Sequence, residues 1–398
     1  MPGNSTSQYV ITREAIDILL AALRKRGFVV LGPTQKGTAI IYDELETSSD
    51  LPIGMTAKEA PASYKLMKRN DDAYFGYAVG PYSWKRFLYP SSLLLFKAHK
   101  KEKGFEVISE NRAEFNAPQI QNKPEATSAQ QELPKYAFFG VRACELSAIE
   151  IQDKIFMGGQ YVDPYYKSVR EQAFIVAVNC TEAGETCFCV SMKTGPEVQR
   201  GYDLLLTEVV SKKEHYFVVK SGSEAGNSVL KELPTQPVTE AHITAVRDGI
   251  EKASKSMGRV LDTTNLKKIL YENFEHSRWD EVAKRCLSCA NCTMVCPTCF
   301  CSTVEDVTDL TGAHAERWRV WDSCFTMEFS YIHGGSIRSS EKSRYRQWMT
   351  HKLASWIDQF GTSGCIGCGR CITWCPVGID ITEEAQAIRN SQQLPIAV

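Results

Sequence analysis

The sequence lacks several features that mark common classes of protein. No apolar run reaches the roughly 18 residues that a transmembrane helix needs, and the densest, Phe174–Val178, has the length of a strand. The first residues show neither the basic nor the apolar region of a signal peptide. With 46 basic and 47 acidic side chains, there is no positive excess to neutralise nucleic acid phosphates. We therefore expect a cytoplasmic protein that binds neither membrane nor nucleic acid.

Motifs of the common hydrolases and nucleotide-binding enzymes are missing as well. The sequence contains no H-E-x-x-H, no G-x-S-x-G, no G-x-G-x-x-G and no P-loop. Cysteine, by contrast, is abundant, with 15 among 398 residues. In a reducing compartment, thiols in such number are expected to bind metal or carry redox chemistry, and not to form a disulfide scaffold.

The cysteines divide the chain into two parts. Eleven of the 15 lie between Cys286 and Cys375, and the other four lie between Cys144 and Cys189. A chain of this length is expected to form two or three domains. We predict an α/β domain over residues 1–237, a helical connection over 238–264 and a cluster-binding domain over 265–398.

Helical and strand patterns alternate in the first part, which predicts the α/β domain. Apolar residues recur at helical spacing from Ile16 to Leu23, with Thr12 placed to cap the helix and Gly27 placed to end it. Strands are predicted at 28–31 and 38–41, separated by Gly-Pro and Gly turns, and at 136–139, 174–178, 204–206 and 216–219, with an exposed loop at 116–134. In the second part, apolar stripes at 266–274 and 345–360 predict helices.

Two cysteine motifs of the same form occupy the second part. In each motif, two residues separate the first cysteine from the second and the second from the third, and a fourth cysteine further on is followed by Pro. The first motif consists of Cys286, Cys289, Cys292 and Cys296, and the second of Cys365, Cys368, Cys371 and Cys375. Three thiolates at this spacing can hold one corner of an iron–sulfur cubane, and in two-cluster ferredoxins the cysteine before Pro ligates the other cluster.

This spacing assigns ligands to two 4Fe–4S clusters that exchange their fourth cysteine. Cluster one takes Cys286, Cys289, Cys292 and Cys375, and cluster two takes Cys365, Cys368, Cys371 and Cys296. Zinc is the alternative, but a zinc site usually joins two cysteine pairs in one tetrahedron, whereas each motif here offers a third equally spaced thiol. Because residues 297–364 separate the motifs, we favour a mainly helical two-cluster, ferredoxin-like domain over a compact ferredoxin with an insertion.

The four cysteines of the first part are candidates for a third cluster. Cys144 follows a predicted strand and turn at the start of a helix, where amide groups favour an anion. Cys180 follows another strand, and Cys187 and Cys189 face the same side of an extended segment. Strand ends meet at one edge of an α/β sheet, which would bring all four together. The alternatives are a zinc site or buried thiols without metal.

Three cysteines exceed these ligand sets. Cys299 and Cys301 follow the first motif closely, and Cys324 lies further on. Buried free cysteines are commonly small apolar side chains in a core. The alternative is that these thiols act directly on sulfur compounds beside a cluster.

Several stretches together resemble a known family of electron carriers. They are residues 140–144, 179–189, 296–301, 331–335 and 356–361. They resemble the beta, iron–sulfur subunit of cytoplasmic NAD(P)-linked nickel–iron hydrogenases, also called sulfhydrogenases. The iron–sulfur subunit of anaerobic sulfite reductase is a similar relative. The resemblance covers residues 136–385.

The resemblance implies the iron–sulfur electron-transfer subunit of an oxidoreductase complex. Its partners would be the large and small subunits of a nickel–iron hydrogenase and a flavoprotein subunit that binds NAD(P). The chain itself would have no hydrogen-activating site, because the paired C-x2-C motifs of a large subunit are missing. The alternative functions are the iron–sulfur subunit of an anaerobic sulfite reductase and a subunit that reduces sulfur or polysulfide. A third interpretation is an assembly protein with purely structural metal sites.

Overall fold

A mixed eight-stranded sheet forms the centre of the first part of the chain. The computed structural model describes residues 8–78, 80–108, 112–114, 133–212 and 214–391. The sheet has the order β13 (Gln236–Pro237), β1 (Gln8–Thr12), β12 (His215–Ser221), β11 (Leu204–Val210), β10 (Phe174–Val178), β9 (Tyr136–Arg142), β2 (Val29–Lys36) and β3 (Ala39–Glu44). β2, β9, β10 and β11 run parallel, and antiparallel strands complete both sides. The α/β prediction for this part is confirmed.

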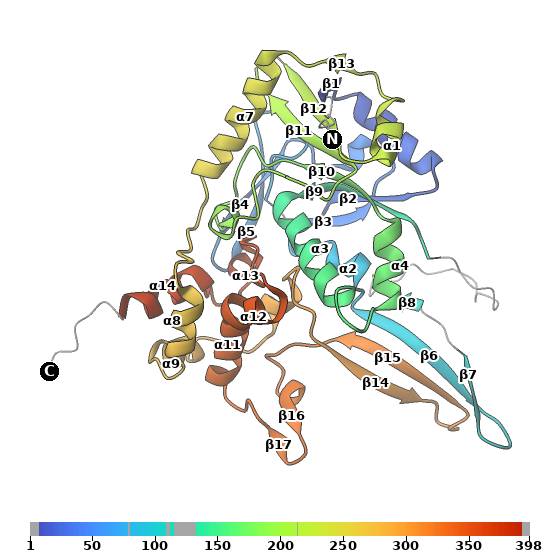
Figure 1. Cartoon of the computed structure of the whole chain (residues 1–398), viewed down its shortest axis with the longest axis vertical. Coiled ribbons are helices and arrows are strands. Elements are labelled where there is room, and N and C mark those ends of the chain that lie inside the picture. Colours follow the sequence, from blue (N-terminus) through green and yellow to red (C-terminus); the bar gives the residue numbers. More distant parts are fainter. Residues whose placement is uncertain (1–7, 79, 109–111, 115–132, 213, 392–398) are drawn as a thin grey trace.

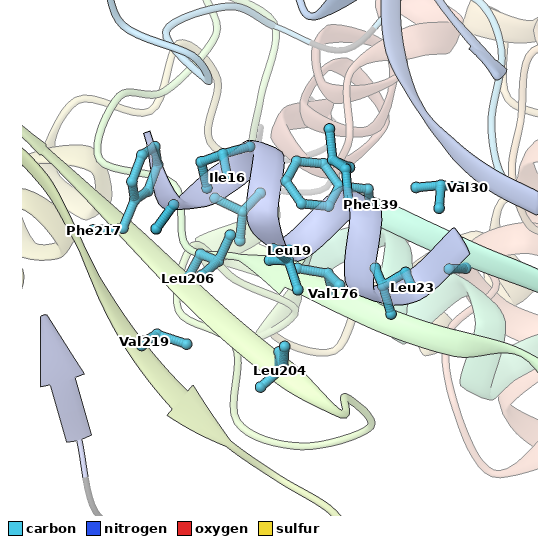
Figure 2. Packing of buried hydrophobic residues seen from close by; sticks show 14 of the residues in the cluster. Ile16, Leu19, Leu23, Val30, Phe139, Val176, Leu204, Leu206, Phe217 and Val219 are labelled. Carbon is cyan, nitrogen blue, oxygen red and sulfur yellow. The ribbon is translucent and has the colours of Figure 1, made fainter. Parts of the chain in front are cut away.

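Helices cover both faces of this sheet. On one face α1 (Ala15–Lys25) buries Ile16, Leu19 and Leu23 against apolar side chains of the parallel strands, and Figure 2 shows this packing. On the other face lie α3 (Ala143–Phe156) and α4 (Pro164–Gln172), with a second apolar core. α6 (Glu224–Leu230) and α7 (Glu240–Lys255) follow the sheet and lead to the second part (Figure 1).

Two local predictions in the first part are wrong. Thr12 does not cap α1, because it is the last residue of β1 and the helix has no side-chain cap. The predicted turn at Gly32 and Pro33 lies inside β2. β2 pairs with β9 only as far as Leu31, so Pro33 sits where the strand has a single neighbour and its missing N–H is tolerated. The loop predicted at 116–134 lies almost wholly outside the described residues.

A second sheet joins the two parts of the chain. β6 (Ser92–Lys100), β7 (Phe105–Ile108) and β8 (Arg112–Glu114) come from the first part, whereas β14 (Ser302–Thr308) and β15 (His314–Trp321) come from the second. β15 pairs antiparallel with both β14 and β6. Figure 1 shows this sheet extending away from the rest of the molecule. Two hairpins stand apart from both sheets: β4 (Met55–Ala60) with β5 (Ser63–Lys68), and β16 (Tyr331–Ile332) with β17 (Gly335–Ser336).

The rest of the second part is helical and has its own apolar core. Its longer helices are α8 (Leu266–Glu272), α9 (Arg278–Ala283), α11 (Glu341–Thr350), α12 (Trp356–Phe360) and α14 (Ile381–Ser391), and a π-helical turn, His351–Ser355, joins α11 to α12. α8 falls within the apolar stripe at 266–274, and α11, the π-helical turn and α12 together cover the stripe at 345–360, where helices were predicted. Short helices α2 (Lys85–Leu88), α5 (Cys189–Met192), α10 (Asn291–Met294) and α13 (Arg370–Thr373) lie beside the cysteine-rich loops. In the part of the chain that the structure describes, no helix is long and apolar enough to cross a bilayer.

Candidate iron–sulfur centres

The two cysteine motifs fold as duplicate loops. We call residues 286–292 loop one and residues 365–371 loop two. Loop one adopts positive φ at Ser288 (49°) and Ala290 (65°), and loop two does so at the equivalent Gly367 (68°) and Gly369 (75°). Each loop then enters a short helix, α10 or α13. The same backbone turns therefore display three cysteines of each motif in the same way.

Each loop also directs a backbone N–H at its first cysteine. Ser288 N donates to Cys286 Sγ at 3.4 Å, and Gly367 N donates to Cys365 Sγ at 3.5 Å. Such hydrogen bonds to sulfur stabilise negative charge on the thiolates and tune the reduction potential of a cluster. The duplication seen in the sequence thus extends to the polar environment of the sulfurs.

A cavity at loop one combines cysteines from both motifs. Cys286, Cys289 and Cys292 line this cavity of about 30 Å³ together with Cys375, the last cysteine of the other motif, and Cys371 of that motif also borders it. Burial raises the pKa of the Cys292 thiol well above its usual value, and the neighbouring Cys286, Cys375 and Cys289 raise it further. The structure therefore brings together the four residues that the crossed assignment gives to cluster one.

Loop two gathers its own three cysteines around Cys296 of the first motif. Burial raises the pKa of the Cys371 thiol, and Cys365, Cys368 and Cys296 then raise it further. Burial also raises the pKa of Cys365, to about 12. Cys365 and Cys371 therefore stay protonated at neutral pH until a metal displaces the protons, whereas the interaction with Cys299 and the charge of Lys352 lower the pKa of Cys296. The four residues assigned to cluster two thus share one buried site.

A buried lysine that the sequence analysis missed touches this second set. Lys352 Nζ donates to Cys296 Sγ at 3.2 Å, to Thr298 Oγ1 at 3.1 Å and to the Gly364 carbonyl at 3.2 Å. Burial acts to lower its pKa, but the charge interactions with Cys296 and Cys299 outweigh burial and raise the pKa overall. An ammonium group in the core at this place is suited to a cluster of negative charge. Lys352 lies within the apolar stripe at 345–360, and nothing in the sequence indicated that it contacts a proposed cluster ligand.

The four cysteines of the first part meet at the carboxyl ends of β9 and β10. These strands are parallel neighbours, so Cys144, at the start of α3, and Cys180, just after β10, emerge at the same edge of the sheet. Burial raises the pKa of Cys144, and Cys189 and Cys180 add to the shift. The pKa of Cys187 is raised in the same way by burial and by Glu59, Cys189 and Cys180. These four cysteines therefore interact at one edge of the sheet, and their role as ligands of a third cluster stays a prediction.

Arginine supplies positive charge at this edge. The buried Arg142 donates from Nη1 to Cys180 Sγ at 3.5 Å, and its Nη2 is fixed by the carbonyls of Phe75 at 2.7 Å and Tyr77 at 3.3 Å. A Cβ at Gly195 would lie 3.3 Å from Cys189 Sγ, so the glycine leaves room next to this thiol. Four thiols, a helix start and a fixed cation together suit an anionic cluster.

Loop two packs directly on the segment that carries Cys187 and Cys189. Phe188 N donates to the Gly367 carbonyl at 2.8 Å, and Thr186 Oγ1 lies 2.8 Å from Thr373 Oγ1. A Cβ on Gly369 would lie only 2.3 Å from Thr186 Oγ1, so glycine is required there for contact as well as for φ. Cys368 contributes to the raised pKa of Cys144, which shows that the second and third thiol sets are neighbours.

A buried ion pair locks this arrangement. Arg370, in loop two, donates to Glu145 Oε1 at 2.5 Å, and each side chain is 1% exposed. Glu145 directly follows Cys144 and also accepts from Tyr42 Oη at 2.8 Å and Trp84 Nε1 at 3.1 Å. The pair thus fixes the third thiol set relative to loop two. No sequence pattern linked Glu145 with Arg370, because the two residues are 225 positions apart.

The remaining three cysteines lie beside these sets. The interaction with Cys296 raises the pKa of Cys299, and the interaction with Cys324 lowers that of Cys301. Lys85 Nζ donates to the Cys299 carbonyl at 3.1 Å, and burial lowers the pKa of this lysine to about 8. None of the three thiols is therefore an isolated core residue.

The donor chemistry fits iron–sulfur clusters. Each set consists of four thiols, the number that a 4Fe–4S cluster requires, and in the first two sets three of them come from one short loop, as in bacterial ferredoxins. Among the described residues, no three His, Cys, Asp or Glu side chains come close enough together to hold a single metal ion.

Comparison with known proteins agrees with this chemistry. A family model described as a 4Fe–4S dicluster domain matches residues 285–379. The chain is 33% identical over 259 residues to the sulfhydrogenase 2 subunit beta of Pyrococcus furiosus, and the match covers 64% of this chain and 75% of that protein. No solved structure matches the chain. The protein therefore belongs to the family of sulfhydrogenase beta subunits, as an iron–sulfur subunit whose dicluster domain holds two 4Fe–4S clusters and transfers electrons.

Proposed function

We propose that this chain relays single electrons through three 4Fe–4S clusters within a cytoplasmic NAD(P)-linked nickel–iron hydrogenase. Its partners would be the hydrogen-activating large and small subunits and a flavoprotein that binds NAD(P). The observation that carries the proposal is that cysteines of the three groups interact with one another, from the exposed Cys289 in loop one to the edge of the α/β sheet. The relative named sulfhydrogenase 2 subunit beta supports membership in such a complex.

The proposed ligands follow the three thiol sets. Cys286, Cys289, Cys292 and Cys375 would hold cluster one, Cys365, Cys368, Cys371 and Cys296 would hold cluster two, and Cys144, Cys180, Cys187 and Cys189 would hold cluster three. Residues 265–398 would then contain the first two clusters, and residues 1–237 would supply the third. Each bound cluster would accept and release one electron at a potential that its surroundings set.

Contacts between neighbouring sets support a relay. Cys289 and the adjacent Leu287 are exposed, so a partner can approach cluster one from outside. Cys292 contributes to the raised pKa of Cys371, which joins the first set to the second. Cys368 contributes to that of Cys144, which joins the second set to the third. The fixed cations Lys352 and Arg142 favour the reduced, more negative state of the sets that they touch.

Iron and acid-labile sulfide analysis of anaerobically purified protein tests the relay. Three clusters predict about twelve iron and twelve sulfide per chain, and two predict about eight of each. We expect Cys180→Ser to remove one cluster and Cys375→Ser to remove the cluster of loop one, whereas the surplus Cys299→Ser keeps all three. Zinc in place of iron would overturn the proposal. An unchanged cluster content in Cys180→Ser would remove the third cluster from it.

Copurification distinguishes the complex from its alternative. If the proposal holds, native complexes that contain this chain also contain nickel and flavin and oxidise hydrogen with NAD(P)⁺. A complex with sirohaem and sulfite reduction, without nickel, would instead assign the chain to an anaerobic sulfite reductase.

A further inference from the structure

Two thiols outside the three ligand sets line an open cleft. Cys301 and Cys324 border a cleft of about 640 Å³, to which Arg338, His351 and Gln359 also contribute. This volume is in the range of about 300–1,000 Å³ that is usual for small-molecule sites. Both thiols are half-buried, so a small molecule in the cleft can reach them. The cleft therefore has the size and the reactive groups of a substrate site.

The open end of the β14–β15 hairpin brings the two thiols together. Ser302 pairs with Trp321 in the hairpin register, and Asp322 N donates to the Cys301 carbonyl at 2.9 Å. This backbone connection brings Cys324 close to Cys301, and both thiols line the same cleft. Two cysteines 23 positions apart are thus held side by side by a rigid element.

We propose that Cys301 and Cys324 form a redox-active dithiol that reduces small organic disulfides bearing carboxylates, with electrons from the neighbouring clusters. The proposal rests on the proposed function for its supply of electrons. Cys324 and Cys292, a proposed ligand of cluster one, pack against the same apolar core and interact electrostatically, so the dithiol lies beside the relay. The cleft would make this chain a site of two-electron chemistry as well as a carrier of single electrons.

The chemistry balances without a further reactant. The Cys301 thiolate attacks one sulfur of the substrate disulfide, forming a mixed disulfide and releasing the first substrate thiol. Cys324 then attacks Cys301 Sγ, which forms the Cys301–Cys324 disulfide and releases the second thiol. Two electrons, delivered singly by the clusters, and two protons from solvent restore the dithiol.

The surroundings of the thiols suit these steps. The hydrogen bond from Cys324 lowers the pKa of Cys301 to about 7 and outweighs the effect of burial, so Cys301 is the attacking thiol. Burial lowers the pKa of His351, so its imidazole is neutral and Arg338 provides the positive charge of the cleft. Among the described residues that line the cleft there is no Asp or Glu, which favours an anionic substrate.

Glutathione disulfide, which carries four carboxylates, is the probe for the first test. The anaerobically purified full chain is equilibrated with mixtures of reduced and oxidised glutathione, alkylated and analysed by peptide mass spectrometry. We expect a Cys301–Cys324 disulfide that forms and disappears with a two-electron dependence, while the visible absorbance of the clusters stays unchanged. Absence of this disulfide in every mixture overturns the proposal. This test needs no electron relay, so it remains informative if the proposed function fails.

The second test measures turnover by the clusters. Protein reduced chemically and freed of excess reductant is mixed with glutathione disulfide, and the released thiol is counted. We expect Cys301→Ser and Cys324→Ser to lose at least about tenfold in rate, and the control Val307→Ser, at an exposed position of the same hairpin, to stay within about twofold. Arg338→Gln should raise KM for glutathione disulfide and leave kcat for an uncharged disulfide unchanged. Equal rates in wild type and Cys301→Ser, with iron content intact, would refute the dithiol while leaving the relay in place.

Discussion

Removing the charge of Lys352 should lower the midpoint potential of cluster two. A buried ammonium group stabilises the reduced cluster because reduction adds negative charge next to it. At the observed 3.2 Å between Nζ and Cys296 Sγ, two unit charges interact by about 5 kcal/mol with an effective dielectric constant of about 20. The added electron is shared among the atoms of a cluster, so roughly half of this applies, about 2.6 kcal/mol. For a one-electron couple that is a shift of about 110 mV.

A redox titration followed by electron paramagnetic resonance measures this shift. Lys352→Met removes the charge and keeps an unbranched side chain, and Lys352→Arg keeps the charge. We expect the potential of cluster two to fall on the order of 100 mV in Lys352→Met and to move much less in Lys352→Arg. Lys36→Met, at an exposed position at the end of β2, serves as the control for a general loss of charge. With iron content equal to wild type, a potential that is unchanged or higher in Lys352→Met would refute the electrostatic argument.

Three further predictions concern stability and cofactor content. Glu145→Gln leaves the Arg370 charge buried without its partner, so the free energy of unfolding in denaturant should fall by about 3–5 kcal/mol. The control Glu150→Gln, in a solvent-accessible ion pair with Arg200, should lose about 0.5 kcal/mol or less. Equal losses in the two variants would contradict the stabilising role of the buried pair. Gly369→Ala should reduce bound iron because its Cβ meets Thr186, whereas the matched Ala290→Gly in loop one should keep wild-type iron. Burial raises the pKa of Glu59 to about 7, above its usual 4.5, so ionisation from about pH 5 to pH 8 costs the folded state stability. Glu59→Gln does not undergo this loss. Its free energy of unfolding minus that of wild type should therefore be about 3 kcal/mol larger at pH 8 than at pH 5. A value that is the same at both pH values would contradict the raised pKa of Glu59.

The sequence predicted those features that depend on short-range pattern. The spacing within each cysteine motif predicted two equivalent loops, because the turns that display three thiols are set within a single short stretch of chain. The strand, turn and helix around Cys144 predicted its place at a sheet edge, and the parallel pairing of β9 with β10 brought Cys180 there. The assignment of individual cysteines to clusters stays a prediction.

Other features depend on contacts between distant residues and left no local signal. Lys352 is a charged residue within the apolar stripe at 345–360 and would ordinarily be placed at the surface. The π-helical turn instead directs it to Cys296, while the adjacent His351 lines the cleft. In the β14–β15 hairpin, β14 is mostly exposed and β15 is half-buried, and neither strand has a fully buried face, so its sequence did not indicate a sheet. Its partner β6 lies far away in the other half of the chain, and only the assembled fold reveals it.

That shared sheet has a consequence for any attempt to isolate the ferredoxin-like half of the protein. Cutting the chain between the two halves would strip β6 from β15 and leave the backbone donors and acceptors of His314–Trp321 open along one side. Bare strand edges of this kind recruit other chains and aggregate. The fragment would also lose Glu145 and leave Arg370 as a lone charge in its interior. Electron transfer therefore depends on the intact chain, and we expect the isolated second half to aggregate instead of forming a smaller electron carrier.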